Sequence, residues 1–503
     1  MRVDIGVNRL VVLVQTICCY QYDFKDDQDA ITLNLSKRGI TSLHVNIKDC
    51  KKLETLFLDG NDLKTLPDEI GRLPELKELD LSNNLLETLP PTIGRLQSLR
   101  KLNLSRNLLV SLPDSIGRLV DLEVLNLSHN SQFVPMNDPN YLKDLNDPES
   151  DPHGTRNQYP EVYEIKVMSL PRKMGGFKNL KELNLSMNEL TSLPEEVCDC
   201  VSLEKLDLTE NKIKTLPNKL NNLKKLEELR LKFNEFREVP DVIGTLGSLK
   251  ALDLSNNMLE EVPNSLGNLT LLEELNLEIN RLKTLPDALG NLKELKELKL
   301  AKNEFEVFPQ VIGNMTKLEQ LDLNFNRLET LPKEISQLKD LLVLKLVSNK
   351  LFEFPSAISY CQKMKSLNLK DNKISVLPSL LLRLVNLVTL DVSGNILKSI
   401  PAKLENLEKL KHLYLSNNEL ESLPEDIGRC INLTHLDLSN NLLKALPVSC
   451  ASLTNLKALY LKNNLLQKIP EVVKNLSNLE DFNYEHKPPT YSWEGISYFT
   501  SQQ

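Results

Sequence analysis

Leucine and asparagine recur along this chain with a period of 23 residues. The surrounding pattern is L-x-x-L-x-L-x-x-N-x-L-x-x-L-P-x-x-I-G-x-L, which residues 53–73 show complete. The L-x-L centre alternates with period two, which predicts a short strand with one buried face. Seventeen asparagines keep this spacing, apart from one break between the fourth and the fifth: Asn61, Asn84, Asn107, Asn130, Asn188, Asn211, Asn234, Asn257, Asn280, Asn303, Asn326, Asn349, Asn372, Asn395, Asn418, Asn441 and Asn464.

The strand positions predict which side chains face the core. Leu56 and Leu58 are expected to point inward, and Thr55 and Phe57 outward. The next strand comes one repeat later, so neighbouring strands run parallel and the rest of the repeat is the crossover between them.

The crossover carries Pro67, Ile70 and Leu73 at intervals of three residues. This spacing favours a short helical or 3₁₀ turn with the proline at its first position, and Gly71 fits the exit of that turn. Asn61 lies where the chain leaves the strand. Its amide is expected to bind loop backbone groups that stacking would otherwise leave buried and unpaired.

A single repeat cannot cover both of its faces, so stability must reside in the interfaces between stacked repeats. Self-similarity at this period indicates a leucine-rich-repeat solenoid. The predicted fold is an α/β solenoid shaped as a horseshoe, with a parallel concave sheet and short helical or 3₁₀ convex segments. Arg38 and Ile165 fill the asparagine position of two further repeats, and Lys487 that of a terminal partial one. The total is about 19 repeats of 23 residues.

The spacing also predicts the organisation of the chain. An N-terminal cap or tail precedes the repeats, an acidic, proline-rich insertion interrupts them, and a C-terminal cap or tail holds Trp493, the only tryptophan. The predicted boundaries are 1–29 for the first cap, 30–130 for the first repeat block, 131–164 for the insertion, 165–487 for the second block and 488–503 for the last cap.

The insertion holds five prolines and seven acidic residues against two basic ones, which predicts an exposed, poorly ordered loop. It is interpreted as a tolerated surface insertion, as an acidic arm that contacts a partner, or as a faulty gene model. Residues 1–29 remain open between a cap, a weak signal segment and a gene-model artefact.

Composition narrows the classes of function. The net charge of −8 disfavours broad nucleic-acid binding, and no apolar run reaches the length of a membrane span. Cys50, Cys200, Cys361 and Cys430 occupy a buried leucine position, and Cys450 replaces the buried isoleucine. This cysteine usage indicates core packing, a cytoplasmic location and no metal site.

The Leu-Pro and Ile-Gly repeat resembles the intracellular Ras-group leucine-rich-repeat proteins. These include a scaffold that couples Ras-type GTPases to type-1 protein phosphatase and Raf, the Ras suppressor protein, and plant relatives. The segment Ile31-Thr-Leu-Asn-Leu-Ser-Lys-Arg-Gly-Ile40 is similar to the opening repeat of that scaffold. The resemblance implies a Ras-type small GTPase, a protein phosphatase or both as partners. This chain lacks the scaffold's long basic tail and an [RK]-[VI]-x-[FW] docking motif.

In each strand, one outward-facing residue lies between the two leucines, and in most repeats it is Asp or Asn. Repeats with another residue at this position mark the candidate site. They predict a basic stripe with apolar anchors on the concave face, which would bind a protein partner. The alternative is drift on a solvated sheet, with the lysines balancing acidic neighbours. The residues are Arg230, Lys232, Phe233, Ile279, Lys299, Lys302, Phe325, Lys345 and Val347.

A second patch is predicted further along the chain, at His412, Tyr414, His435 and Tyr460. The two histidines occupy the same position on adjacent strands, but two ligands do not make a metal site. No nucleophile–base pair can be placed, so we expect no enzyme and no cofactor. The predicted function is a monomeric intracellular scaffold in Ras-type signalling. The alternatives are a regulatory subunit for a phosphatase or kinase, and an extracellular receptor-like module.

Overall fold

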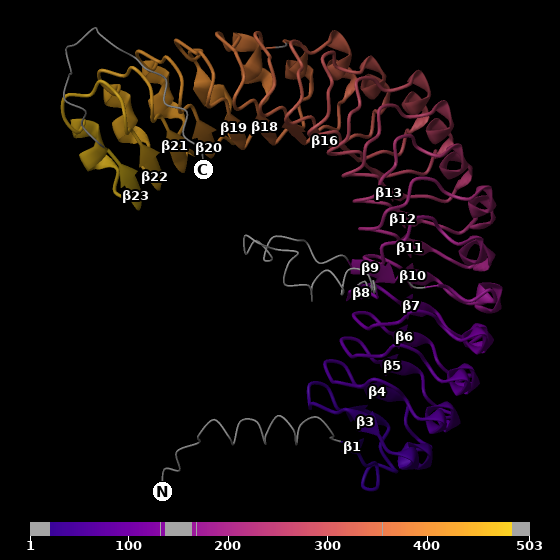
Figure 1. Cartoon of the computed structure of the whole chain (residues 1–503). Coiled ribbons are helices and arrows are strands. Elements are labelled where there is room, and N and C mark those ends of the chain that lie inside the picture. Colours follow the sequence, from indigo (N-terminus) through magenta and orange to yellow (C-terminus); the bar gives the residue numbers. More distant parts are fainter. Residues whose placement is uncertain (1–20, 131, 136–162, 167–168, 355, 485–503) are drawn as a thin grey trace, which may run out of the picture. The chain divides into compact units, whose positions relative to one another are not determined.

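The structure is a computed structural model that describes residues 21–130, 132–135, 163–166, 169–354 and 356–484. The chain divides into two compact units, Met1–Leu259 and Glu260–Gln503. In each unit, three-residue strands lie along one face and short 3₁₀ turns along the opposite face (Figure 1). We call the strand side the concave face of the unit.

Unit 1 contributes nine described strands to its parallel sheet. They are β2 (Thr32–Asn34), β4 (Thr55–Phe57), β5 (Glu78–Asp80), β6 (Lys101–Asn103), β7 (Val124–Asn126), β10 (Glu182–Asn184), β11 (Lys205–Asp207), β12 (Glu228–Arg230) and β13 (Ala251–Asp253). Its turns are η1 (Val45–Asp49), η2 (Asp68–Arg72), η3 (Pro91–Arg95), η4 (Asp114–Arg118), η6 (Met174–Gly176), η7 (Glu195–Asp199), η8 (Asn218–Asn222) and η9 (Asp241–Thr245).

Unit 2 contributes ten described strands. They are β14 (Glu274–Asn276), β15 (Glu297–Lys299), β16 (Gln320–Asp322), β17 (Val343–Lys345), β18 (Ser366–Asn368), β19 (Thr389–Asp391), β20 (His412–Tyr414), β21 (His435–Asp437), β22 (Ala458–Tyr460) and β23 (Asp481–Asn483). Its turns are η10 (Asn264–Asn268), η11 (Asp287–Asn291), η12 (Gln310–Asn314), η13 (Lys333–Gln337), η14 (Ser356–Tyr360), η15 (Ser379–Arg383), η16 (Leu404–Asn406), η17 (Glu425–Arg429), η18 (Val448–Ser452) and η19 (Glu471–Asn475).

The predicted strand register is confirmed. Leu56 and Leu58 are buried, and Thr55 and Phe57 are partly exposed on the opposite side of β4. Leu56 pairs with Leu79 of the next strand, and the same parallel register repeats along each sheet. The predicted parallel solenoid is therefore formed, because the repeats of each unit present their leucines to one continuous core in that unit.

The asparagine ladder is also confirmed, and Asn303 shows how it works. Its Nδ2 donates to the carbonyl oxygens of Leu277, at 2.9 Å, and Leu300, at 3.1 Å. Its Oδ1 accepts from the backbone N–H of Leu282 at 3.0 Å. Since Leu277 and Leu282 belong to the preceding repeat, each such side chain joins its own repeat to the one before.

The turns differ from the prediction in two details. Pro67 directly precedes η2, with φ of −69°, and does not occupy its first position. Gly71 lies within η2 and has no positive φ, so it is not a left-handed turn exit. A Cβ on Gly71 would lie 2.2 Å from the carbonyl oxygen of Thr92 in the next repeat. The glycine is needed because successive turns stack closely.

The separate repeat predicted around Ile165 is not formed. Strand β7 pairs directly with β10, and the backbone N–H of Asn130 donates to Asn188 Oδ1 at 2.8 Å. Ile165 lies in β9 (Tyr163–Lys166), which pairs antiparallel with β8 (Gln132–Pro135). The spacing of 58 from Asn130 to Asn188 is thus one repeat of 23 plus 35 inserted residues. The spacing predicted a separate repeat because the convex half of the interrupted repeat, which follows the insertion, again fits the 23-residue period. Ser111 and Ser169 form a β-bridge in this convex half.

At the N-terminal end, part of the predicted cap is described. Strand β1 (Gln21–Tyr22) pairs with β3 (Ser42–Leu43), and Phe24 is fully buried beside the first repeat. Residues 1–20, most of the insertion, Lys487 and the predicted cap at 488–503 lie outside the described residues.

The cysteines in the described part of the chain lie where the pattern placed them. Cys50, Cys198, Cys200, Cys361, Cys430 and Cys450 are all free and buried. Burial raises the pKa of the Cys361 thiol to about 11 and that of Cys200 to about 12. These side chains stay neutral and serve as small core residues.

Candidate protein-binding surface

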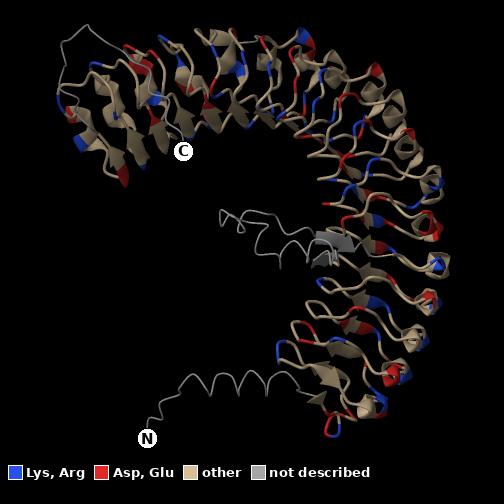
Figure 2. Ribbon diagram, in the orientation of Figure 1, with Lys and Arg blue, Asp and Glu red and all other residues tan. Residues whose placement is uncertain are grey.

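The outward residues of adjacent strands form straight columns on the concave face of each unit. In unit 2, Asn276, Lys299, Asp322 and Lys345 stand side by side because β14 to β17 pair without a register shift. Basic and acidic residues are interspersed along both units (Figure 2). The structure places Arg230, Lys232 and Phe233 in unit 1 and the other six residues of the predicted stripe in unit 2.

Much of the predicted basic stripe is neutralised by its neighbours. Lys345 Nζ lies 3.2 Å from Asp322 Oδ2, and Lys299 Nζ lies 2.9 Å from Glu297 Oε1. In unit 1, Arg230 forms ion pairs with Glu228 and Asp207. The strand column itself therefore presents alternating charge, which is the arrangement that solvated parallel strands favour.

The apolar anchors lie at a second position, immediately before each ladder asparagine. The backbone there is left-handed in every described repeat that carries a ladder asparagine. Asn, Asp and Gly tolerate this conformation, whereas a bulky or β-branched side chain is strained in it. The residues at this position in the later repeats of unit 2 are Asp371, Gly394, Asn417, Asn440 and Asn463.

Phe233, Ile279 and Phe325 occupy this left-handed position with φ of 53°, 54° and 55°. Their side chains are 44%, 39% and 49% exposed. Lys232 Nζ lies 4.9 Å from the centre of the Phe233 ring, and Lys302 Nζ lies 5.7 Å from that of Phe325. These apolar residues are strained where they stand and keep 39–49% of their surface exposed, so core packing does not account for them.

Val347 takes part in the same edge of unit 2. It is half-buried, and its carbonyl oxygen accepts from the N–H of Phe325 at 2.7 Å. Its own N–H donates to Asn324 Oδ1 at 2.7 Å. The backbone beneath Phe325 is thereby fixed by two bonds to the neighbouring repeat.

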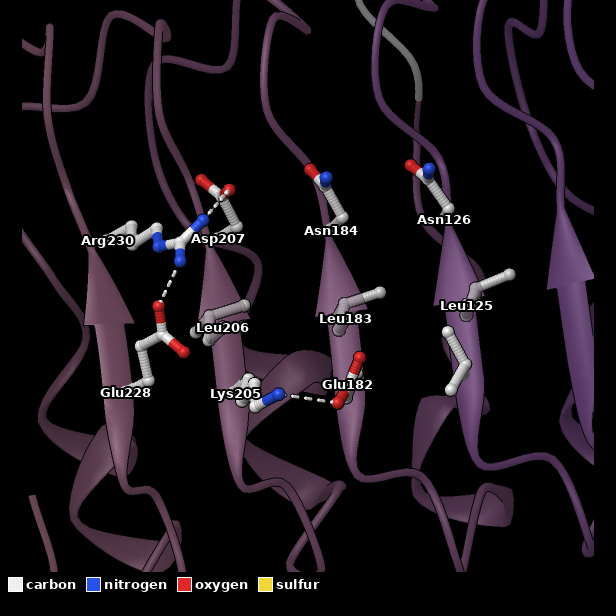
Figure 3. A pocket seen from close by; sticks show the side chains of 11 residues that line it. Leu125, Asn126, Glu182, Leu183, Asn184, Lys205, Leu206, Asp207, Glu228 and Arg230 are labelled. Atoms are coloured by element: carbon white, nitrogen blue, oxygen red, sulfur yellow. Dashed lines mark hydrogen bonds and ion pairs between the residues drawn. The ribbon is translucent and has the colours of Figure 1, made fainter. Parts of the chain in front are cut away.

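Unit 1 has a shallow hollow of about 270 Å³ over β7, β10, β11 and β12 (Figure 3). Its floor is formed by strand leucines, and the outward side chains beside them are short because Asn126 and Asn184 stand there. Lys205 Nζ contacts Glu182 Oε1 at 2.8 Å on one side, and Arg230 closes the other.

A second groove of unit 1 runs along the left-handed position. His129, Met187, Glu210 and Phe233 line this space of about 470 Å³. Burial, and then the charge of Arg106, hold the pKa of His129 below its usual range. The groove mixes apolar and polar walls.

The predicted second patch is assembled in unit 2. The rings of His412 and His435 lie 4.7 Å apart, and the His412 and Tyr414 rings stack at 6.5 Å. Burial, then the charge of His435 and Lys411, lowers the pKa of His412. Tyr460 donates from its hydroxyl to Asp481 Oδ2 at 2.6 Å. The patch is polar and aromatic.

In the described part of the chain, no three His, Cys, Asp or Glu side chains are grouped as metal ligands. None of the helices described is both long and apolar enough to cross a membrane.

A family model for the leucine-rich repeat region matches residues 32–147, 164–257, 248–351 and 402–492. These matches cover more than half of the chain. The chain belongs to the leucine-rich repeat family. A search of curated protein sequences finds no match.

Solved leucine-rich repeat structures resemble this one. A leucine-rich repeat protein of Leptospira interrogans is 32% identical with a TM-score of 0.66, over 92% of this chain and 99% of that one. The Arabidopsis receptor kinase HAESA, solved with the peptide hormone IDA and the co-receptor SERK1, is 26% identical with a TM-score of 0.62, over 91% and 78%. A TDR receptor has the same identity and TM-score, over 87% and 70%.

Sequence reasoning found the exposed apolar residues but missed why they stand out. The left-handed backbone was the missing fact, and its signal was readable as the recurrence of Asn, Asp and Gly before the ladder asparagine. It also missed cations just after the ladder, such as Arg281 and Lys350, because only positions before the ladder asparagine were considered. The ion pairs of Arg230 and Lys345 depend on cross-strand geometry that a single repeat does not display.

Proposed function

We propose that this leucine-rich repeat protein is a non-enzymatic scaffold that binds protein partners on its concave face. The observation that carries the proposal is the placement of Phe233, Ile279 and Phe325 at exposed left-handed positions. Exposed aromatic and aliphatic residues beside cations are typical hot spots of protein interfaces. Binding a partner would give these strained side chains a role that folding does not.

The proposal extends to intracellular signalling with a Ras-type small GTPase as partner. Its support is the resemblance of the Leu-Pro and Ile-Gly repeat, and of residues 31–40, to the Ras-group proteins. Buried, unpaired cysteines such as Cys361 and Cys430 support a reducing compartment. A regulatory subunit for a phosphatase or kinase is a variant of the same proposal, with a different partner on the same face.

A receptor-like extracellular module is the second candidate. The observation in its favour is the likeness to plant receptor kinases, at 26% identity for HAESA. The free cysteines weigh against it, because secreted domains commonly use cysteines in disulfides. Imaging a C-terminally tagged full chain separates the candidates: a cytoplasmic signal supports the scaffold, and secretion supports the receptor-like module.

The binding proposal is tested with the full chain and purified Ras-type GTPase loaded with a GTP analogue or GDP, by titration calorimetry. We expect binding that prefers the GTP form and that the double variant Phe233→Ala, Phe325→Ala weakens by about 2–4 kcal/mol. The unfolding midpoint of that variant should not fall, because both side chains are exposed.

The matched control is Tyr414→Ala with Tyr460→Ala, which removes two other rings that are partly exposed. Loss of binding in this control, with full binding in the phenylalanine variant, would move the site to the second patch. Absence of binding to either nucleotide form would remove the GTPase from the proposal. Quantitative capture from cytosol by the same variants then tests the phosphatase and kinase alternatives.

A further inference from the structure

One edge of unit 2 differs in chemistry from the rest of the unit. We define the edge strip as the residues two before, one before and one after the five ladder asparagines from Asn280 to Asn372. Its members are Glu278, Ile279, Arg281, Ala301, Lys302, Glu304, Asn324, Phe325, Arg327, Val347, Ser348, Lys350, Lys370, Asp371 and Lys373. All lie where β14 to β18 end, so they form one continuous border of the sheet.

The edge strip is basic in an acidic protein. It holds six cations, which are Arg281, Lys302, Arg327, Lys350, Lys370 and Lys373, against the three acids Glu278, Glu304 and Asp371. The whole chain carries a net charge of −8. Among the described residues, only Arg327 of these six cations forms an ion pair, with Glu304 at 3.6 Å and Glu306 at 3.8 Å. The strip is therefore suited to an acidic ligand.

The same positions in the next three repeats provide an internal comparison. They hold Ser393, Gly394, Ile396, Ser416, Asn417, Glu419, Ser439, Asn440 and Leu442, with a single charge among them. At the left-handed position these repeats carry Gly394, Asn417 and Asn440, which tolerate this backbone conformation. Compared with these three repeats of unit 2, the edge strip is thus the basic part of the border, and it carries the strained residues Ile279 and Phe325.

The distance between the apolar residues Ile279 and Phe325 indicates the backbone conformation of the ligand. Ile279 and Phe325 lie two repeats apart on the paired strands β14, β15 and β16, which corresponds to about 9.6 Å. Between them lie the small, buried Ala301 and the exposed Lys302. An extended polyproline II segment brings every third side chain to the same face, with a rise of about 9.3 Å per turn. A β-strand ligand returns to the same face after about 6.7 Å, which does not fit this spacing.

We propose that the edge strip binds an extended acidic protein segment that carries an apolar side chain at every third position. The apolar side chains contact Ile279 and Phe325, and the acidic residues between them pair with Lys302, Lys350 and Lys370. The strip spans four strand intervals, about 19 Å, so about six residues of the segment are recognised. This inference rests on the proposed scaffold function and names the kind of segment that the scaffold reads.

The probe is a fluorescein-labelled synthetic peptide of about nine residues, long enough to cross the strip. It has Leu or Phe at every third position and Glu, Asp or Pro elsewhere. Binding to the full chain is followed by fluorescence anisotropy at low and high salt. We expect saturable binding that weakens with salt. A peptide with serine at the apolar positions, and one with lysine in place of the acids, should each bind at least tenfold more weakly.

Two protein variants test the location. Ile279→Asn with Phe325→Asn should weaken peptide binding at least tenfold, while its unfolding midpoint stays equal or rises because asparagine suits the left-handed backbone. Lys350→Glu with Lys370→Glu changes exposed residues only and should lower affinity mainly at low salt. The matched control is Val448→Asn with Ile469→Asn, which replaces two exposed apolar residues away from the strip and should bind normally.

Equal peptide binding by the wild type and both strip variants would overturn the inference, as would no binding by the wild type. Either result would leave the GTPase titration untouched, so failure of the strip and failure of the scaffold proposal are distinguishable. Single-stranded DNA of random sequence is the competitor. If it binds the strip more tightly than the peptide, the ligand is a nucleic acid and the inference is wrong.

Discussion

Replacing Asn303 by alanine is expected to lower the free energy of unfolding by about 1–3 kcal/mol. The amide makes close bonds to the carbonyl oxygens of Leu277 and Leu300 and to the N–H of Leu282. Alanine leaves the N–H of Leu282 without a partner, and the fully buried leucine side chains around it exclude water. The carbonyl oxygens of Leu277 and Leu300 each lose one of two ladder bonds and keep those from Asn280, at 3.1 Å, and Asn326, at 3.0 Å. A buried polar group without a partner costs about 1–3 kcal/mol, so the loss exceeds that of an ordinary surface change.

The matched control for this prediction is Asn291→Ala, in the exposed turn η11 of the preceding repeat. It removes the same amide where no ladder bond is made and should change stability by less than about 0.5 kcal/mol. Urea unfolding, followed by circular dichroism, measures both variants. Equal midpoints for Asn303→Ala and Asn291→Ala would mean that ladder bonds are replaceable, and the account of how repeats are joined would be wrong.

The ladder was predictable because each of its determinants is local. Asn303, Leu298 and Leu300 lie within six residues, and the same trio recurs one period later. When identical repeats stack, parallel pairing of their strands is the arrangement that buries all the leucines. Their position in the repeat likewise predicted the burial of Cys361 and Cys430, since each stands where other repeats have leucine.

Features that depend on contacts between repeats were not predictable in this way. Ile165 matched the spacing of a repeat, but the direct pairing of β7 with β10 decides that it lies in an insertion. The strain at Ile279 and Phe325 follows from a backbone angle that the leucine pattern does not encode. The partner of Lys345 is Asp322 on the neighbouring strand, a contact that appears only after stacking.

The role of glycine in the turns gives the second large effect. Gly94→Ala is expected to lower the free energy of unfolding by about 2–3 kcal/mol. Its Cβ would lie 2.0 Å from the carbonyl oxygen of Ser115 and 2.7 Å from the carbonyl carbon, so turns η3 and η4 must separate. The hydroxyl of Ser115 donates to the carbonyl oxygen of Pro91 at 2.7 Å, and that bond would lengthen with the separation.

The control for Gly94 is Gly247→Ala, because a Cβ at Gly247 meets nothing within 4 Å and its φ is not positive. That change should be neutral or stabilising by up to about 1 kcal/mol, since alanine restricts the unfolded chain. Gly94→Ala is therefore expected to lower the urea midpoint, whereas Gly247→Ala should leave it unchanged or raise it. Cys198 and Leu382 carry buried side chains at the position equivalent to Gly94. If Gly94→Ala unfolds at the wild-type midpoint, turns η3 and η4 accept a side chain at this position as the turns with Cys198 and Leu382 do. Close stacking would then not explain why residue 94 is glycine.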